Sequence, residues 1–333
     1  MNRVGLSIVI PVGRGDDDHL QVLLASLDAQ DYPKDKLEVL CIREGNSEEA
    51  KAMGIGKATG DIIGMFCTDN VCVGSSFLTT MVDAARQPGV VGAYPSHYHY
   101  TRQDTLLSRY FALLGANDPL CWWLGKADRD SYLSRSIQLN TRPNTLGKKG
   151  VESVEKVHDT RIKTFCRGSV PSLGDNGFFI KASLAKSVLT SPDEFGSCMD
   201  MCEDLRQAGH ATYAIVPTTL WHRTGLSWRR YFVKRWRYVR ELYWMALPTR
   251  RWRMVHGARD GVYCLGFAAA SLLVVPHLLV SYWGYRRLRD PAGFLHPLVC
   301  GVLTFLYTLA WLEHILKQVW SFRPGTVRRA TRN

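Results

Sequence analysis

Two charged residues near the middle of the first half of the chain have the types and spacing of a ligand site. Asp69 follows Ile62 to Phe66, an apolar run of strand length, and Lys51 lies on the stretch of helical character before that run. An acid just beyond the carboxyl end of a strand lies where ligands of α/β sheets bind, in the crevice outside the strand ends. The pattern therefore indicates a ligand site at this edge of a sheet.

The elements that must position these residues alternate between strands and helices. Leucines recur at helical spacing between residues 20 and 27, and Tyr32-Pro33 ends that helix. The expected strands are Leu6–Val12, Leu37–Ile42, Ile62–Phe66, Val90–Tyr94 and Ala211–Val216, and the expected helices are His19–Ala29, Glu48–Ala58, Ser76–Ala85 and Glu203–Ala208. Repeats of this kind predict an α/β fold with a mostly parallel, doubly wound sheet. Between residues 96 and 164 the periodicity fades, which we interpret as an insertion in the same domain.

Composition narrows the class of protein. The chain has 333 residues, of which 46% are hydrophobic, so a large buried core is expected. Its formal charge is +12, and the segment from Arg223 to Arg259 alone holds eleven Lys/Arg and one acid, a net +10. Such a block predicts an anionic partner, either a membrane surface or nucleic acid. Nine scattered cysteines without paired spacing argue against a disulfide framework and favour a reducing compartment, and we expect no signal peptide.

Two uncharged stretches lie near the end of the chain, Gly261 to Gly284 and Ala292 to Leu312. About 20 residues of helix cross a hydrocarbon core, so both have the length of a membrane span. Pro276 and Pro297 leave a re-entrant pair open, and a buried helical hairpin of a soluble protein is the other alternative.

Eight short motifs occur in an order that resembles the family 2 glycosyltransferases, which have the GT-A fold. The resemblance covers roughly residues 6–240. The motifs are SIVIPV, SLDAQDYP, AKAMGIGKATGD, CTDN, GDNGFFIKAS, LRQAGH, VPTTLWH and the basic, aromatic run that begins at Trp228. Any one of them is weak evidence, but their common order is specific.

The resemblance implies a nucleotide-sugar donor, with a UDP-sugar as the best guess, and Mn²⁺ or Mg²⁺ at its diphosphate. Asp69 matches the metal-binding acid of the strand-end motif, and His222 matches a histidine near the metal. Where the family usually has a further acid, this chain has Cys67, which we interpret as a small packed residue because a thiolate suits Mg²⁺ poorly.

Further residues match donor-binding positions of the family. Pro11, Val12 and Thr68 lie at the expected strand ends. Glu44 stands in the turn that recognises the base, and Lys51 matches a basic position near phosphate. Asp175 and Asn176 match the loop that lines the donor sugar, where two glycines allow close approach of the backbone.

The resemblance places the catalytic base near residue 200. An inverting transferase needs a carboxylate to take the acceptor's proton unless the acceptor is already an anion. The positions where the family usually has a Glu-Asp pair hold Ser197 and Cys198, so Asp200 is our first candidate, followed by Asp204 and Glu203. Asp200 and Asp204 are four residues apart and can share a helical face.

The run from Trp228 onward mixes arginine with aromatic residues. This composition suits either nucleic acid or an amphipathic helix at lipid headgroups. The apolar stretches that follow favour the membrane, so we expect no nucleic-acid partner. Arg229 and Arg230 are candidates for contact with diphosphate or with a phospholipid acceptor.

Together these observations predict a membrane-attached, inverting, metal-dependent glycosyltransferase, with its catalytic domain on the cytoplasmic side of the inner membrane. Assembly into a homo-oligomer is left open. The expected acceptor is polyprenyl phosphate or a lipid-linked saccharide. The alternatives are a transferase that elongates a cell-surface polysaccharide and a non-catalytic membrane scaffold that kept the fold. The expected organisation is a catalytic domain over residues 1–222 with an acceptor-facing insertion at 96–164, an amphipathic interface segment at 223–259, two transmembrane or re-entrant helices at 260–316, and a basic tail at 317–333.

Overall fold

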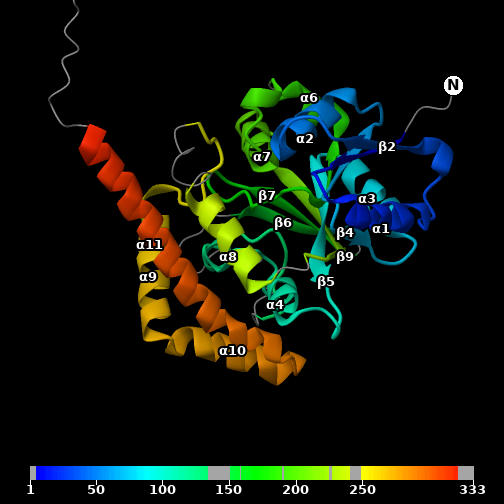
Figure 1. Ribbon diagram of the computed structural model, residues 1–333. Helices are drawn as coiled ribbons and strands as arrows, with labels where there is room; N and C mark the ends of the chain where they lie inside the picture. Colours follow the sequence, from blue (N-terminus) through cyan, green and yellow to red (C-terminus); the bar gives the residue numbers. More distant parts are fainter. Residues whose placement is uncertain are drawn as a thin grey trace, which may run out of the picture.

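A single mixed β-sheet forms the centre of the computed structural model, which describes residues 5–133, 151–157, 159–189, 191–224, 227–240 and 249–321. The strand order is β2-β1-β3-β8-β5-β9-β7-β6, and β4 pairs with β9 (Figure 1). The strands are β1 (Leu6–Pro11), β2 (Leu37–Ile42), β3 (Ile62–Phe66), β4 (Asn70–Cys72), β5 (Gly92–His99), β6 (Val151–Val157), β7 (Thr160–Phe165), β8 (Asn176–Lys181) and β9 (Thr212–His222).

The sheet is mixed, so the expectation of a mostly parallel sheet is wrong. β1 pairs in parallel with β2 and β3, and β5 pairs in parallel with β9. β8, however, lies antiparallel between β3 and β5, and β6, β7 and β9 are successively antiparallel. Val157 of β6 pairs with Thr160 of β7, only three positions later. Strands so close in sequence can pair only antiparallel, because a parallel pair needs a long crossover.

Helices cover both faces of the sheet and bury alternate strand residues. Ile8 and Ile10 of β1 enter the core beneath α1 (Asp17–Asp28) and α3 (Phe77–Arg86), whereas Val9 enters the core beneath α2 (Ser47–Lys57) and α7 (Cys198–Gln207). α6 (Ala182–Ser187) lies on the α2 side. This two-residue alternation is what a strand buried on both faces requires.

The region expected as an insertion is partly built into the sheet. It contains α4 (Leu106–Leu114), α5 (Pro119–Trp123), β6 and β7, while residues 134–150 lie outside the described part of the chain. α4 packs against α8 (Trp228–Arg237) and α11 (His296–Ser321) in a third core that includes Tyr110, Tyr231 and Val299. Its acceptor-facing role stays a prediction, as do the domain boundaries.

The C-terminal helices form a group at one side of the sheet (Figure 1). Besides α11 they are α9 (Gly257–Leu273) and α10 (Val275–Leu288), and short 3-10 turns occur at Lys34–Lys36, Pro192–Glu194 and Pro291–Leu295. Of the described helices, one is long and apolar enough to cross a membrane by itself, over Pro291–Lys317, which contains the second expected span.

The first expected span, Gly261 to Gly284, is not one straight helix. It breaks at Val274, whose φ is 62°, and α9 and α10 meet at 82°. Pro276, in the first turn of α10, has no N–H to continue the hydrogen bonding of α9. The pair has the shape of a broken span or of a re-entrant loop.

Candidate active site

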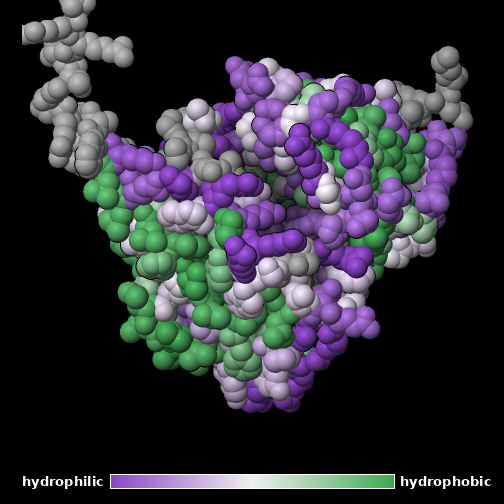
Figure 2. Space-filling view, viewed as in Figure 1, coloured by the Kyte–Doolittle hydropathy of each residue, from purple (hydrophilic) through white to green (hydrophobic). Residues whose placement is uncertain are grey.

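A cleft of about 650 Å³ opens at the carboxyl ends of β1 and β3. One wall consists of the end of β1 with Pro11 and the following Val12, the turn that holds Thr68 and Asp69, and the start of α2. Residues of α8 form another wall. Figure 2 shows polar residues gathered around a hollow in the middle of this face.

Asp69 and His222 are brought together by the short pairing of β4 with β9. Asn70 lies opposite His222 in this ladder, and the amide of Arg223 donates a hydrogen bond of 2.8 Å to the carbonyl of Asp69. The Nε2 of His222 then lies 3.3 Å from Oδ2 of Asp69. β9 is longer than expected, which is why the predicted strand Ala211–Val216 did not reach this histidine.

The two side chains perturb each other's titration. Burial alone would raise the pKa of Asp69, but the charge and hydrogen bond of His222, with a contribution from Lys234, lower it below the ordinary value. Burial would lower the pKa of His222, but Asp69 raises it above the ordinary value. The pair therefore favours a carboxylate beside an imidazole that holds its proton more firmly than usual.

Lys51 lies at the centre of a second charged group. Its Nζ is 2.8 Å from Oδ2 of Asp175 and 2.7 Å from Oε1 of Glu48, and the lysine is 5% exposed. Burial would raise the pKa of Asp175, but the charge of Lys51 and its hydrogen bond to the carboxylate lower the pKa of Asp175 to about 2. Both predicted residues line the cleft, yet they are paired with each other, which the sequence did not indicate.

Cys67 lines the cleft beside this charged group. Burial, together with the nearby charges of Asp175 and Asp69, raises the pKa of this thiol well above its ordinary value. The thiol therefore stays neutral, and the interpretation of Cys67 as a small packed residue stays a prediction.

The wall formed by α8 is basic. Arg230, Lys234 and Arg237 line the cleft together with Tyr231 and Tyr238. The three basic residues are four, three and seven positions apart, so they lie on one face of the helix. This periodicity was missed at the sequence level.

A neighbouring ion pair fixes α8 in place. Arg235 contacts Asp118 at 3.2 Å and also donates to the carbonyl of Asn117. Tyr307 of α11 donates a hydrogen bond of 2.6 Å to the same carboxylate of Asp118. The basic wall is therefore anchored both to the loop before α5 and to α11.

The three candidates for the catalytic base lie outside the cleft lining. Asp200 is fully buried and pairs with Arg250 at 2.7 Å, while the backbone amides of Arg251 and Trp252 each donate to its Oδ1 at 2.8 Å. Asp204 pairs with the side chain of Arg251 at 2.7 Å.

Glu203, the third candidate, is likewise engaged, because Arg206 pairs with it at 2.8 Å. These contacts give all three acids structural partners, so the geometry does not favour any of them as a base. α7 begins earlier than predicted because the hydroxyl of Ser197 caps it by accepting from the amide of Asp200.

Two other predicted residues point elsewhere. Glu44 and Arg229 are exposed and do not line the cleft, whereas Asn46, near Glu44, does. Asn176 lines the cleft as expected, and its amide oxygen accepts a hydrogen bond of 3.1 Å from Asn70. The predicted donor loop is thus tied directly to the turn that carries Asp69.

Asp69 and His222 have the chemistry of a divalent-cation site. The Oδ1 atom of Asp69 is buried and makes no hydrogen bond, which leaves a lone pair free for a cation. Asp175 is held by Lys51, and Oδ1 of Asn70 accepts from the amide of Cys67, so neither is free to join. The described residues fit Mn²⁺ or Mg²⁺ with two protein ligands, the remainder coming from a ligand or water.

No family model matches this chain, and no curated protein matches it. Among solved structures, it is similar to the mannosyltransferase PcManGT from Pyrobaculum calidifontis in complex with GDP-Man and Mn²⁺, with 13% identity and a TM-score of 0.46 over 96% of this chain and 89% of that one. It is also similar to residues 1–349 of S. aureus TarS in complex with UDP, with 11% identity and a TM-score of 0.35 over 94% of this chain and 92% of that one. At such values the likeness carries no conclusion about the activity of this chain.

Proposed function

We propose that this protein is a glycosyltransferase that takes a nucleotide-diphosphate sugar, with a UDP-sugar as the first candidate. One observation carries the proposal: the strand-end cleft is lined by an acidic wall around Asp69 and also by the basic wall of Arg230, Lys234 and Arg237. A cation bound to a diphosphate presents a positive centre and surplus negative oxygens, which complements these two walls.

Asp69 and His222 would hold the divalent cation of the donor. Such an ion would neutralise the charge that develops on the departing diphosphate. The residues of α8 would bind the outer phosphate oxygens, and the cluster of Lys51 and Asp175 would face the sugar and the inner phosphate. Because α8 is anchored through Arg235, its charges are held in place before the donor arrives.

The state of the carboxylates in the cleft favours an acceptor that is already an anion. Among the described lining residues, Glu48 and Asp175 hold Lys51, Asp69 faces His222, and Asp16 accepts from the amide of Gly13 at 3.1 Å. A phosphate nucleophile needs no base to remove a proton, unlike a sugar hydroxyl. We therefore place polyprenyl phosphate first among the acceptors, and the family resemblance implies inversion at the anomeric carbon.

An apolar groove next to the cleft suits the hydrocarbon chain of such an acceptor. It has a volume of about 490 Å³ and lies between α9 and α11, with Leu265, Phe267 and Trp311 in its lining. Arg250 borders both the groove and the cleft, and Arg253 lies in the groove. Because Arg250 is already paired with Asp200, the exposed Arg253 is the residue that would offer positive charge to a lipid phosphate whose chain lies in the groove.

Attachment to a membrane is supported by the surface of the C-terminal helices. Large apolar side chains on α9 to α11 face outward, among them Leu265 at 73% and Leu272 at 81% exposure, and Figure 2 shows hydrophobic residues gathered over these helices. An apolar face of this kind marks a membrane or protein contact. We propose the inner membrane, with the catalytic domain on its cytoplasmic side.

Two alternatives make different predictions. A transferase that elongates a surface polysaccharide would need a base for a sugar hydroxyl, and the engaged acids of α7 do not favour one. A non-catalytic scaffold is consistent with those same engaged acids, but it gives no reason for opposite charges on the two walls of the cleft.

The test uses the full-length protein purified in detergent, with UDP- and GDP-sugars, Mn²⁺, and polyprenyl phosphate in mixed micelles. We expect release of nucleoside diphosphate and formation of a glycosylated lipid, both lost with EDTA or with Asp69→Asn. Asp28→Asn, at a side chain that is 88% exposed, is the matched control and should behave as the wild type. Absence of both turnover and nucleotide binding with every donor would leave the scaffold as the better explanation. Separately, release of the protein from membranes by high salt alone would contradict embedding in the bilayer.

A further inference from the structure

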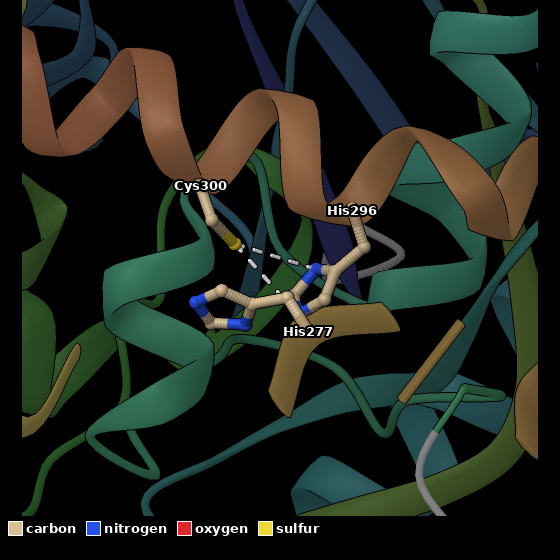
Figure 3. Close-up of side chains that lie close together, drawn as sticks. All are labelled: His277, His296 and Cys300. Atoms are coloured by element: carbon tan, nitrogen blue, oxygen red, sulfur yellow. Dashed lines mark hydrogen bonds between the residues drawn. The ribbon is translucent and has the colours of Figure 1, made fainter. Parts of the chain in front are cut away.

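Three metal-binding side chains meet in the joint between the C-terminal helices. They are His277 of α10 and His296 and Cys300 of α11, and all three are fully buried (Figure 3). One ligand atom from each lies within 4.8 Å of the other two. The donor cleft does not include any of these residues.

The surrounding hydrogen bonds hold each imidazole by one nitrogen. The hydroxyl of Tyr110, on α4, lies 2.8 Å from Nδ1 of His296. The hydroxyl of Ser271, on α9, lies 3.2 Å from Nε2 of His277. The other nitrogen of His277, Nδ1, is buried and makes no hydrogen bond of ordinary geometry. Metal-binding histidines have this arrangement, with one nitrogen held by an oxygen and the other left for the metal.

The separation of Cys300 from His296 also suits a metal, and the ligand atom of His277 lies within 4.8 Å of both. Metal–nitrogen bonds of about 2.0–2.1 Å and a metal–sulfur bond of about 2.3 Å at tetrahedral angles place nitrogen and sulfur about 3.6 Å apart. Sγ of Cys300 lies 3.6 Å from Nδ1 and 3.7 Å from Nε2 of His296. A weak hydrogen bond between the thiol and the imidazole would explain this contact but would leave Nδ1 of His277 without a partner.

We propose that His277, His296 and Cys300 bind one Zn²⁺ ion, through Nδ1, Nε2 and Sγ respectively, with water in the fourth position. Two imidazoles and a thiolate suit Zn²⁺ and do not suit Mg²⁺, so this site is distinct in chemistry from the oxygen-rich end of the donor cleft. Binding exchanges the thiol proton of Cys300 for the metal and releases that proton to solvent.

A bound ion would hold α4, α9, α10 and α11 together at one point. His277 belongs to α10 and the other two ligands to α11, while Ser271 of α9 and Tyr110 of α4 orient the imidazoles. α10 follows the sharp break at Val274, so a bond from α10 to α11 fixes the angle at which the broken helix pair returns. The site is thus structural and sets the position of the C-terminal helices against the catalytic part.

The test uses the full chain in detergent, stripped with a chelator and titrated first with Zn²⁺ and then with Co²⁺ as a spectroscopic probe. We expect one tightly bound Zn²⁺ per chain that Mn²⁺ does not displace. Bound Co²⁺ should give a thiolate-to-cobalt charge-transfer band with the visible spectrum of a tetrahedral ion. Cys300→Ser should abolish the charge-transfer band, and Tyr110→Phe should weaken Zn²⁺ binding by about tenfold because His296 loses its orienting partner.

Cys264→Ser is the matched control, since Cys264 lies in α9 of the same helix group but outside the cluster. It should keep both the stoichiometry and the charge-transfer band. The proposal is overturned if the stripped protein binds neither ion, or if Cys300→Ser binds Co²⁺ with an unchanged spectrum. Because the readout is metal binding, it is independent of whether the protein transfers sugars.

Discussion

Replacing Lys51 by methionine tests whether this residue serves mainly to neutralise acids or to bind phosphate. Its ammonium group lies 2.8 Å from Asp175 and 2.7 Å from Glu48, and Lys51→Met would leave both carboxylates without their cation. At an effective dielectric constant of about 20, each contact is worth roughly 6 kcal/mol before the cost of desolvation is subtracted. Breaking a buried pair by removing one partner typically costs about 3–5 kcal/mol.

The lower end of this range applies here because the two acids are not equally buried. The side chain of Glu48 is 34% exposed and can recover water, whereas that of Asp175 is 17% exposed and recovers little. We therefore expect a loss of about 3 kcal/mol, which for a chain of 333 residues corresponds to a fall in melting temperature of about 4 °C. The double variant Lys51→Met/Asp175→Asn removes the orphaned charge and should regain most of this loss.

The assay is thermal unfolding of the detergent-solubilised protein, followed by titration with UDP. Lys57→Met, at the exposed end of the same helix, controls for the loss of a lysine and should melt as the wild type does. If Lys51 also binds phosphate, the double variant will be stable but will bind UDP weakly. The reasoning is refuted if Lys51→Met melts within about 2 °C of the wild type, or if the double variant melts no higher than the single one.

Four further predictions follow from the same geometry. The lowered pKa of Asp175 means that the stability it contributes, about 2 kcal/mol, is complete above pH ~4 and is lost as the pH falls toward 2, so melting curves of the wild type and Asp175→Asn should converge over that window. Asp200→Asn should lower stability by about 2–3 kcal/mol because it breaks a buried ion pair, while turnover of the folded protein falls less than tenfold; a thousandfold loss at unchanged melting temperature would restore Asp200 as the base. Lys234→Gln, on the cleft side of α8, should weaken UDP binding by about tenfold in calorimetry, whereas Arg229→Gln, on its exposed side, should not change the dissociation constant. Cys67→Asp adds a carboxylate beside Asp175, so without metal this variant should melt at a lower temperature than the wild type. Mn²⁺ should raise the melting temperature of the variant more than that of the wild type. Equal shifts would argue that residue 67 does not face the cation.

Local pattern was sufficient for the elements that build the first half of the sheet. The runs at Leu37–Ile42 and Ile62–Phe66 are apolar, short and bounded by turn residues, and they form β2 and β3 with the expected bounds. The direction of β8 was harder to predict, because it depends on the path of the long chain segment before this strand. No local sequence pattern encodes that path. The same holds for the hairpin of β6 and β7, whose charged residues gave no clear period.

Within the cleft, sequence reasoning placed residues better than it assigned their partners. Asp69 and His222 were both expected, and β4 brings them together through a pairing of only three residues. The acids near residue 200 lie outside the cleft lining, and the sequence did not indicate their partners, because the arginines at 250 and 251 lie about 50 positions downstream. Their role as base stays a prediction, which the ion pairs do not favour.

The basic segment shows why charge alone could not distinguish a lipid surface from a diphosphate. We expected the segment at a lipid surface, with Arg229 and Arg230 also as candidates for diphosphate, and α8 presents several of its basic residues to the cleft. The apolar surface lies instead on α9 to α11, and Arg250 borders both the cleft and the groove between those helices. If the groove holds the chain of a lipid acceptor, its phosphate would lie close to Arg250, whose guanidinium is held in place by Asp200. The two substrates would then meet where the basic wall ends and the apolar surface begins, which places the reaction at the level of the lipid headgroups.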